Sequence, residues 1–337
     1  MAETLNPIKK IDNNKKYVFI INPKSFAFDN TKIQNFINSI KSFFEEIKTN
    51  ENVYDYYFYE TKFPRDSINY LSKIILETPK TQIIRIFAVG GDGVLFDCLN
   101  GIMRHENCEL ANIPHGKTND FLAGFDKSGK KFMDLQNQLS APTELIDTIN
   151  IGTNYAINMC VVGLEAEAAF WAYKFMKTHK KIFEKFPKLA PKTFALGGLM
   201  SLLNPQTRTK IYKIKIEDEP EIEGKFTTIN IANNCRYGGQ NTAVPEAVPN
   251  DGILNVLCTR GLSTLNGLRI ISNYLKGKWQ KYPDLFIYKK ITKIEISANT
   301  PISINLDGEV FYDLNLNLKI VPKSVKFVTL NDIKSEK

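Results

Sequence analysis

The sequence is short of the residues that build disulfide frameworks and metal centres. Its 337 residues include only five Cys and three His, and no two cysteines form a CxxC pair. An odd, scattered set of thiols in a chain of this length is typical of a protein in a reducing compartment. His105, His115 and His179 also lack the spacing of metal ligands. These scarcities argue against a cross-linked secreted domain and against a structural zinc site.

Long hydrophobic runs are absent as well. A membrane-spanning helix needs about 20 predominantly apolar residues. The longest stretch without a charged residue, 148–164, is interrupted by three asparagines and two glycines. The first sixteen residues are polar and carry lysines, so they do not resemble a signal peptide. We therefore expect a cytoplasmic protein that can associate with a membrane only from its surface.

The charge balance favours anionic partners. The formal net charge is +8, with 44 Lys and Arg against 36 Asp and Glu. Nucleotide phosphates and acidic lipid head groups fit such a surplus. No nucleic-acid-binding module is recognisable, so we do not expect a nucleic-acid partner. The length indicates two domains, and the 43% hydrophobic content is sufficient for two cores.

Strand and helix patterns alternate in the first third of the chain. Apolar runs at 17–21, 53–59, 83–89 and up to 114 predict strands, and residues spaced as on a helix follow them at 33–47, 67–76 and 95–103. Such a series predicts an α/β domain with a parallel sheet, whose loops gather at the carboxyl ends of the strands.

From about residue 145 the pattern becomes a series of strands separated by Asn-, Gly- and Asp-rich turns. The expected strands are 155–162, 210–217, 226–232, 254–259, 291–297, 302–306 and 316–321. They predict a mostly antiparallel β domain, interrupted by helical spacing over 166–203. We expect domains at 15–147 and 148–321, with 322–330 returning to the first.

The most specific chemical feature is the turn Gly90-Gly91-Asp92-Gly93 between a predicted strand and helix. Glycines there let the backbone approach phosphates closely, and the start of the helix favours anions. Asp92 is placed to act through Mg²⁺. The spacing of the P-loop and of the dinucleotide-binding fingerprint is absent. Taken alone, the same turn would be a tight loop with an Asp cap.

Two further segments carry polar residues. Pro114–Phe121 follows the next strand, so its Lys117 and Thr118 would face the same phosphates. In the β half, Asp307 and Glu309 lie two apart at the end of a predicted strand, and paired carboxylates suit accepting a proton from a hydroxyl. Asp-Gly pairs are ordinarily hairpin turns, and the residues do not decide which carboxylate would be the base.

These motifs, in this order, resemble the diacylglycerol kinase catalytic-domain family, which includes sphingosine and ceramide kinases. The resemblance runs from about residue 17 to residue 330. It implies a phosphofructokinase- and NAD kinase-like α/β domain followed by a β-sandwich domain, with ATP between them. It also includes Asp97, Asn100, Gly101, Asn158 and Gly163, and in the β domain Arg236–Gly239, Pro245, Ala247 and Asp251–Gly252.

The resemblance assigns roles to individual positions. The catalytic carboxylates would be Asp307 and Glu309. Mg²⁺ would be held by Asp92 and by the loop of Val248, Asp251 and Ile253. The residues implied for binding ATP are Asn22, Pro23, Ser25, Thr61, Gly90, Gly91, Asp92, Gly93, Gly116, Lys117, Asn119 and Asp120.

Some positions depart from the family pattern. Phe26 stands where a Gly is usual, Val94 and Phe96 replace Thr and Asn, and Lys117-Thr118 replaces Thr-Gly. An active lipid kinase, with diacylglycerol as the favoured acceptor, remains the main interpretation. A soluble-substrate kinase of the NAD kinase type and a non-catalytic pseudokinase that binds lipid or nucleotide are the alternatives.

Residues 169–186 interleave aromatic residues with lysines, and 196–203 add an apolar patch. This composition favours an interfacial helix that meets an anionic membrane surface, although a helix packed on the β domain would show the same spacing. The resemblance also suggests a homodimer.

Overall fold

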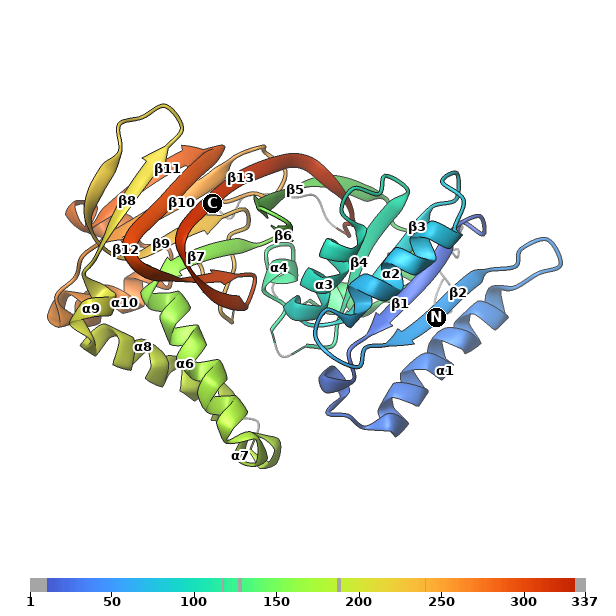
Figure 1. Ribbon diagram of the computed structural model, residues 1–337. Helices are drawn as coiled ribbons and strands as arrows, with labels where there is room; N and C mark the ends of the chain where they lie inside the picture. Colours follow the sequence, from blue (N-terminus) through green and yellow to red (C-terminus); the bar gives the residue numbers. More distant parts are fainter. Residues whose placement is uncertain (1–10, 117, 127–128, 187–188, 240, 331–337) are drawn as a thin grey trace, which may run out of the picture. The chain divides into compact units, whose positions relative to one another are not determined.

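A computed structural model describes residues 11–116, 118–126, 129–186, 189–239 and 241–330 (Figure 1). The chain divides into two compact units. Unit 1 is Met1–Ile146 with Lys323–Lys334, and unit 2 is Asp147–Pro322 with Ser335–Lys337. Lys117, one of the predicted ATP-binding residues, lies outside the described residues.

Unit 1 is built on parallel strands in the order β13–β4–β3–β1–β2. Its own strands are β1 (Lys16–Ile21), β2 (Asp55–Glu60), β3 (Ile84–Gly90) and β4 (Cys108–Pro114). The central strand β3 is buried at every residue, because it has helices on its faces and a strand on either side. The parallel sheet predicted from the sequence is confirmed.

Helices connect these strands. They are η1 (Pro23–Phe26), α1 (Asn30–Ile47), α2 (Asp66–Glu77), α3 (Asp92–Ile102), α4 (Asp120–Ala123), η2 (Lys130–Met133) and α5 (Leu135–Ser140). α1 begins at the cap Asp29, whose carboxylate accepts from the backbone N–H groups of Thr31 and Lys32. Its buried stripe of Ile33, Ile37, Ile40 and Phe44 packs on the apolar face of the sheet.

The main strand pairs of unit 2 are antiparallel. The order β11–β10–β9–β7–β12–β13 forms its main path. β8 pairs with both β9 and β12, so β9, β7, β12 and β8 close a ring of four strands. The strands are β5 (Thr143–Ile151), β6 (Asn154–Ala156), β7 (Met159–Gly163), β8 (Lys210–Ile216), β9 (Ile222–Ala232), β10 (Leu254–Arg260), β11 (Phe286–Ile291), β12 (Lys293–Leu306) and β13 (Glu309–Val328).

The helices of unit 2 gather on one side of these strands (Figure 1). They are α6 (Leu164–Thr178), α7 (Lys180–Lys185), α8 (Ala190–Leu203), α9 (Pro205–Arg208) and α10 (Thr264–Tyr274), with short turns η4 (Trp279–Lys281) and η5 (Pro283–Leu285). The helical segment predicted over 166–203 is therefore three helices. α6 ends at Thr178, and His179 is its C-terminal cap.

Two strand predictions differ from the structure. The single strand expected at 155–162 is split into β6 and β7, because the backbone of residues 157–159 turns to bind a carboxylate described below. The strands expected at 291–297 and 302–306 are one continuous strand, β12, with an irregularity between Ser297 and Ile302. The fold class, an α/β domain followed by a β-rich domain, is confirmed.

No helix in the described part of the chain is long and apolar enough to cross a membrane. The five cysteines are all described and buried, and none of them forms a disulfide.

Candidate functional site

Four loops of unit 1 meet at one edge of its sheet. In the parallel register Ile21 pairs with both Glu60 and Val89, and Gly90 pairs with Pro114. The segments that follow these strands therefore start side by side. They contain the predicted residues Asn22, Pro23, Ser25, Thr61, Gly90, Gly91, Asp92, Gly93, Gly116, Asn119 and Asp120. We call this the carboxyl edge of unit 1.

The glycines at this edge permit a contact between loops that any side chain would block. A Cβ on Gly116 would lie 2.2 Å from the Gly91 Cα, and a Cβ on Gly91 would lie 2.7 Å from the Thr118 carbonyl oxygen. A Cβ on Gly90 would lie 2.9 Å from the Ser25 Oγ. These distances are below contact. The loops after β3 and β4 are therefore packed backbone against backbone, and the Ser25 side chain of the loop after β1 packs against Gly90.

Gly93 differs from its neighbours, because a Cβ there would have no atom within 4 Å. It lies in the first turn of α3, where backbone N–H groups are not used by the helix. The open space above Gly93 is therefore the part of this edge at which an anion could approach a helix start.

The Asp92 carboxylate joins two of the loops. Its Oδ2 accepts from the Asp120 backbone N–H at 3.0 Å, and its Oδ1 accepts from that of Phe121 at 3.3 Å. Asp92 thus caps the start of α4 from a different helix. The sequence predicted Asp92 as a metal ligand. In the structure its carboxylate oxygens already accept two backbone hydrogen bonds, so a metal would have to share these oxygens.

Asparagine and threonine side chains order the remaining loops. Asn22 Oδ1 accepts from the Lys24 backbone N–H at 3.0 Å, and the Thr61 N–H donates to the Ile21 carbonyl at 2.9 Å. Asn119 Nδ2 donates to the Gly116 carbonyl at 3.0 Å. Its Oδ1 is buried and has no hydrogen-bond partner among the described residues. A buried acceptor left open in a loop of this kind is a place where a ligand or a water binds.

The positions that depart from the family pattern are filled by packing. Val94 and Phe96 are 4% and 1% exposed, and Val94 lies against Gly90. Phe26 stacks on His115 with ring centroids 4.5 Å apart, and burial lowers the pKa of His115. These side chains belong to the core under the loops, so their apolar character has a structural reason.

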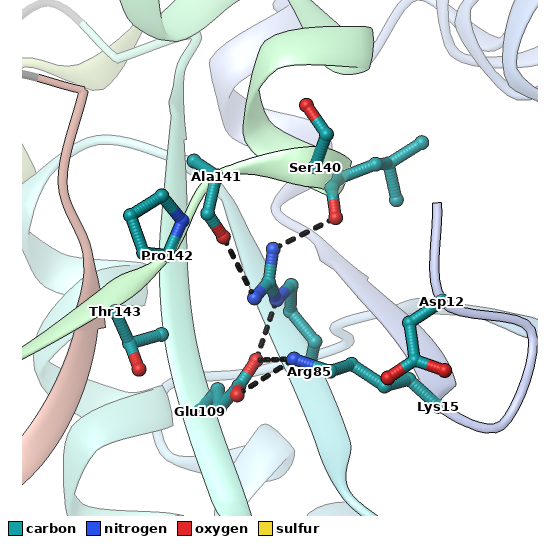
Figure 2. A pocket seen from close by; sticks show the side chains of 9 residues that line it. Asp12, Lys15, Arg85, Glu109, Ser140, Ala141, Pro142 and Thr143 are labelled. Atoms are coloured by element: carbon teal, nitrogen blue, oxygen red, sulfur yellow. Dashed lines mark hydrogen bonds and ion pairs between the residues drawn. The ribbon is translucent and has the colours of Figure 1, made fainter. Parts of the chain in front are cut away.

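A hollow of about 470 Å³ lies at the opposite edge of the same sheet (Figure 2). Arg85 is the second residue of β3 and Gly90 the last, which places them roughly 17 Å apart along the strand. Arg85 donates to Glu109 at 2.6 Å and to the carbonyls of Gln138, Leu139 and Ala141. Lys15 donates to both oxygens of Glu109 at 2.8 and 2.9 Å. Because these charges are already paired, we regard the hollow as a structural feature.

In unit 2 the two predicted catalytic carboxylates have different surroundings. Asp307 Oδ2 accepts from the backbone N–H of Ile157 at 2.6 Å, and its Oδ1 accepts from that of Met159 at 2.7 Å. The Asn158 N–H lies within hydrogen-bond distance of both oxygens, at 3.1 and 3.2 Å. This carboxylate therefore shapes the turn between β6 and β7.

Glu309 begins β13 directly after the turn at Asp307 and Gly308. Its side chain is exposed, and its carboxylate accepts no hydrogen bond from any described residue. Asp307 has a positive φ of 49°, which is uncommon for a residue other than glycine. The turn thus carries one carboxylate bound by backbone and one available to solvent.

The predicted Mg²⁺ loop brings together two carboxylates, one of which the sequence analysis missed. Asp147 Oδ2 accepts from the Gly252 N–H at 2.7 Å, and Asp251 Oδ1 accepts from the Ile253 N–H at 3.0 Å. Burial raises the pKa of Asp251, and the Asp147 carboxylate adds to this shift. Two neighbouring carboxylates in a loop of backbone carbonyls are a donor set that suits Mg²⁺. Val248 lies in the same loop.

Asp147 carried one sequence signal, an acidic residue between the apolar Ile146 and Ile149 at the expected domain boundary. Among the described residues, no group of three or more His, Cys, Asp or Glu side chains gathers as a metal site would. A cation in unit 2 would therefore depend on backbone oxygens as well as on Asp147 and Asp251.

Comparison with known proteins agrees with this geometry. Residues 16–151 match the model of the diacylglycerol kinase catalytic domain, and residues 184–329 match the YegS C-terminal NAD kinase beta sandwich-like domain. Curated proteins of Staphylococcus aureus strains JH9 and Newman, both named "Putative lipid kinase", are 24% identical over 271 residues. The alignment covers 80% of this chain and 84% of theirs.

Solved structures show the same fold. A crystal structure described as a diacylglycerol kinase from Bacillus anthracis has a TM-score of 0.64 at 17% identity. A second from the same organism, titled as a putative diacylglycerol kinase, has a TM-score of 0.69 at 19% identity. Each covers 94% of this chain and 97% of its own. With both halves matched in order, the chain belongs to the diacylglycerol kinase catalytic-domain family, the lipid kinases that its sequence resembles.

Proposed function

We propose that this lipid kinase transfers the γ-phosphoryl group of ATP to the hydroxyl of a lipid, with diacylglycerol giving phosphatidic acid as the reference reaction. One observation supports the proposal above others. The predicted nucleotide loops converge at the carboxyl edge of unit 1, where Gly93 is open and Asn119 presents a buried acceptor without a partner.

In this proposal the carboxyl edge of unit 1 binds ATP. The backbone of Gly91 and Gly93 and the start of α3 would hold the phosphates, as helix starts do in other phosphate sites. The side chains of Asn22, Ser25 and Thr61 would complete the edge. The catalytic effect of such a site comes mainly from positioning and from charge stabilisation.

Glu309 is the better candidate for the base that accepts the hydroxyl proton. A base must approach the proton that it removes, and the Glu309 side chain is exposed and accepts no hydrogen bond from a described residue. Asp307, by contrast, is occupied by three backbone N–H groups. We propose that Asp307 fixes the turn that presents Glu309.

Mg²⁺ is the metal that this reaction requires. When bound, it neutralises the charge of the phosphate chain. In unit 1 the residue that would hold Mg²⁺ is Asp92 at the carboxyl edge. In unit 2 an ion would be held separately by the loop of Val248, Asp251 and Ile253 together with Asp147. The pKa of Asp251, raised partly by the neighbouring Asp147, fits a site that a cation stabilises.

A labelling experiment tests the proposal. Purified protein is incubated with radiolabelled ATP, Mg²⁺ and either dioctanoylglycerol, a total lipid extract or NAD, beside the Glu309→Gln variant. We expect label in the lipid fraction with the wild type and none with the variant. Label only in NADP would favour the soluble-substrate alternative, and ATP binding without any transfer would favour a pseudokinase.

A membrane surface would bring the lipid to the enzyme, and the exposed side chains of helix α6 support such a role. It buries Ala166, Ala168, Ala169 and Ala172 and exposes Trp171, Tyr173 and Phe175 at 42–45%. A helix that only packed on the β domain would bury its large apolar side chains instead. α8 packs closely on it, since a Cβ on Gly197 would lie 2.6 Å from the Ala168 carbonyl oxygen.

Lysines surround these exposed side chains. Lys174 lies 4.8 Å from the centre of the Trp171 ring, and Lys185 lies 5.5 Å from that of Phe186. α8 adds an exposed apolar set of Leu196, Leu199, Met200 and Leu203. We propose that this α6–α8 surface docks on anionic membranes, where each lysine near the lipid contributes about 1 kcal/mol.

Vesicle sedimentation tests the docking surface. We expect the protein to sediment with phosphatidylglycerol-rich vesicles at low salt and to be released by salt. Lys174→Glu with Lys177→Glu should weaken binding roughly tenfold or more. Equal binding by this variant and the wild type would sink the proposal, and a concentration-dependent dimer lost with Trp171→Ser would assign the surface to a second copy instead.

A further inference from the structure

Polar side chains lie on the sheet face that packs against α10, among the apolar residues of the core. Thr228 on β9 pairs with Thr259 on β10, and Asn230 pairs with Leu257. Directly opposite residues of an antiparallel pair share a face. Leu257 belongs to the apolar core that α10 completes, so the polar side chains face that core. Thr228, Asn230 and Thr259 are 0–3% exposed.

Two of these side chains have polar atoms without partners. Asn230 Oδ1 and Thr259 Oγ1 are buried and make no hydrogen bond within the part of the chain that the structure describes. Leaving a buried polar atom unpaired costs roughly 1–3 kcal/mol, and native proteins rarely tolerate it without a reason. On adjacent strands Asn230 and Thr259 are diagonal neighbours, about 7 Å apart. A single small group could therefore reach both.

Glu165 and Tyr274 complete what we call the Glu165 cluster, with Thr228, Asn230 and Thr259. The Tyr274 hydroxyl donates to Glu165 Oε1 at 2.5 Å and accepts from Asn230 Nδ2 at 2.5 Å. Burial raises the pKa of Glu165, although hydrogen bonds from Tyr274 and its neighbours oppose the shift. The Glu165 residue is partly buried, and its carboxylate lies within this network of hydrogen bonds.

The cluster lies close to the turn that carries Glu309. Asn158, whose backbone binds Asp307, donates through Nδ2 to the Arg236 carbonyl at 2.9 Å. The next residue, Tyr237, interacts with Glu165. On the sheet, Asn305, Val161 and Asn230 form one row across three strands, which spans roughly 10 Å.

We propose that the Glu165 cluster binds a second hydroxyl of the acceptor lipid, beside the hydroxyl that is phosphorylated. A hydroxyl can donate to Asn230 Oδ1 and accept from Thr259, which satisfies both unpaired atoms. An ester carbonyl can only accept, so it would leave Asn230 Oδ1 unpaired. The acceptor class is therefore a lipid with two hydroxyls, such as a monoacylglycerol, in preference to diacylglycerol. The inference rests on the proposed lipid kinase function.

Thr259→Val tests it, because Val has the shape of Thr and lacks the unpaired hydroxyl. We measure kcat/KM for a monoacylglycerol and a diacylglycerol with the same acyl chains. The preference for the monoacylglycerol should fall about five- to tenfold in the variant. The melting temperature should not fall, since the removed hydroxyl makes no hydrogen bond. Tyr282→Phe, which removes a hydroxyl near α10 outside the cluster, is the matched control and should keep the preference.

A binding measurement separates this inference from the proposed function. Monoacylglycerol should raise the melting temperature of the wild type more than that of Thr259→Val. If the lipid raises the melting temperature as expected but no turnover is seen, the lipid site is supported and the kinase proposal is refuted. Turnover with equal lipid preference in the wild type and Thr259→Val would refute the site and leave the kinase proposal intact.

Discussion

The Asp307 carboxylate reaches the Asn158 backbone N–H with both of its oxygens, at 3.1 and 3.2 Å. These residues are 149 positions apart, so the contact joins the turn after β12 to the turn before β7. Asp307 and Glu309, which the sequence predicted as a catalytic pair, therefore have different surroundings. The Asp307 carboxylate is bound by backbone N–H groups, and the Glu309 side chain is exposed.

Asp307→Asn and Glu309→Gln should therefore have opposite effects. Glu309→Gln should reduce lipid phosphorylation by about 100-fold or more, because the reaction loses its base. Its melting temperature and ATP affinity should match those of the wild type. Asp307→Asn should lower the free energy of unfolding by about 2 kcal/mol, because an amide N–H₂ would face backbone N–H groups. Thermal unfolding and turnover are measured on both variants. If Glu309→Gln is unstable and Asp307→Asn is stable, the two roles, catalytic base and turn-fixing residue, are assigned the wrong way round.

The glycines of unit 1 give a second prediction. Gly116→Ala places a Cβ 2.2 Å from the Gly91 Cα, so it should destabilise the loops and abolish ATP binding. Gly93→Ala meets no atom within 4 Å and should leave the fold intact or slightly stabilised within α3. If phosphates lie against Gly93, this variant should still lose ATP affinity. Calorimetric titration with ATP measures both, and full affinity in Gly93→Ala would remove Gly93 from the phosphate site.

Arg85→Met should destabilise unit 1 without touching the proposed site. Arg85 is 2% exposed and pairs with Glu109, so its removal breaks a buried network. Loss of one partner from such a network costs about 3–5 kcal/mol. Urea unfolding measures this effect. Lys73→Met, at an exposed pair with Glu77, is a suitable control and should change stability by less than about 1 kcal/mol.

Glu165→Gln should alter stability in a pH-dependent way. Burial raises the folded-state pKa of Glu165 above the ordinary 4.5, so the folded protein binds this proton more tightly than the unfolded chain does. The contribution of protonated Glu165 to the free energy of unfolding is complete below about pH 4.5 and is lost as the pH rises through the folded-state pKa. Gln, which stays neutral, should therefore raise the melting temperature relative to wild type at pH 7. The gain should disappear near pH 4, and a constant difference would contradict the shift.

The sequence predicted the fold of unit 1 well, because its signals are local. Apolar runs ending in Asn-Pro, Gly-Gly or Pro-His mark the strand ends, and the spacing of Ile33 to Ile47 marks α1. The carboxyl edge followed from topology alone, since parallel strands bring their following loops together. The family assignment and the fold class are confirmed, and the relatives and the matched domain are those of lipid kinases.

The features that the sequence did not predict depend on contacts between distant residues. Nothing near Asp307 indicates that its carboxylate binds the backbone of residues 157–159. Nothing near Asp92 indicates that it caps α4. Thr228, Asn230 and Thr259 read as ordinary strand residues, and only the register of β9 with β10 places them on one buried face. The predicted ATP, Mg²⁺ and membrane sites remain predictions that the experiments above test.

The strand β13 starts at Glu309 and ends at Val328, where Lys326 and Phe327 pair with Glu109 and Leu110 of β4. Phe327 is fully buried, and its ring meets that of Phe121 at 5.1 Å. Residues 326 and 327, near the end of the described part of the chain, therefore add the edge strand of the unit 1 sheet. During synthesis on the ribosome, the edge of β4 stays open until residues 326 and 327 have emerged. A fragment ending near residue 146 should aggregate through that edge, and adding a peptide of residues 323–330 in trans should rescue it.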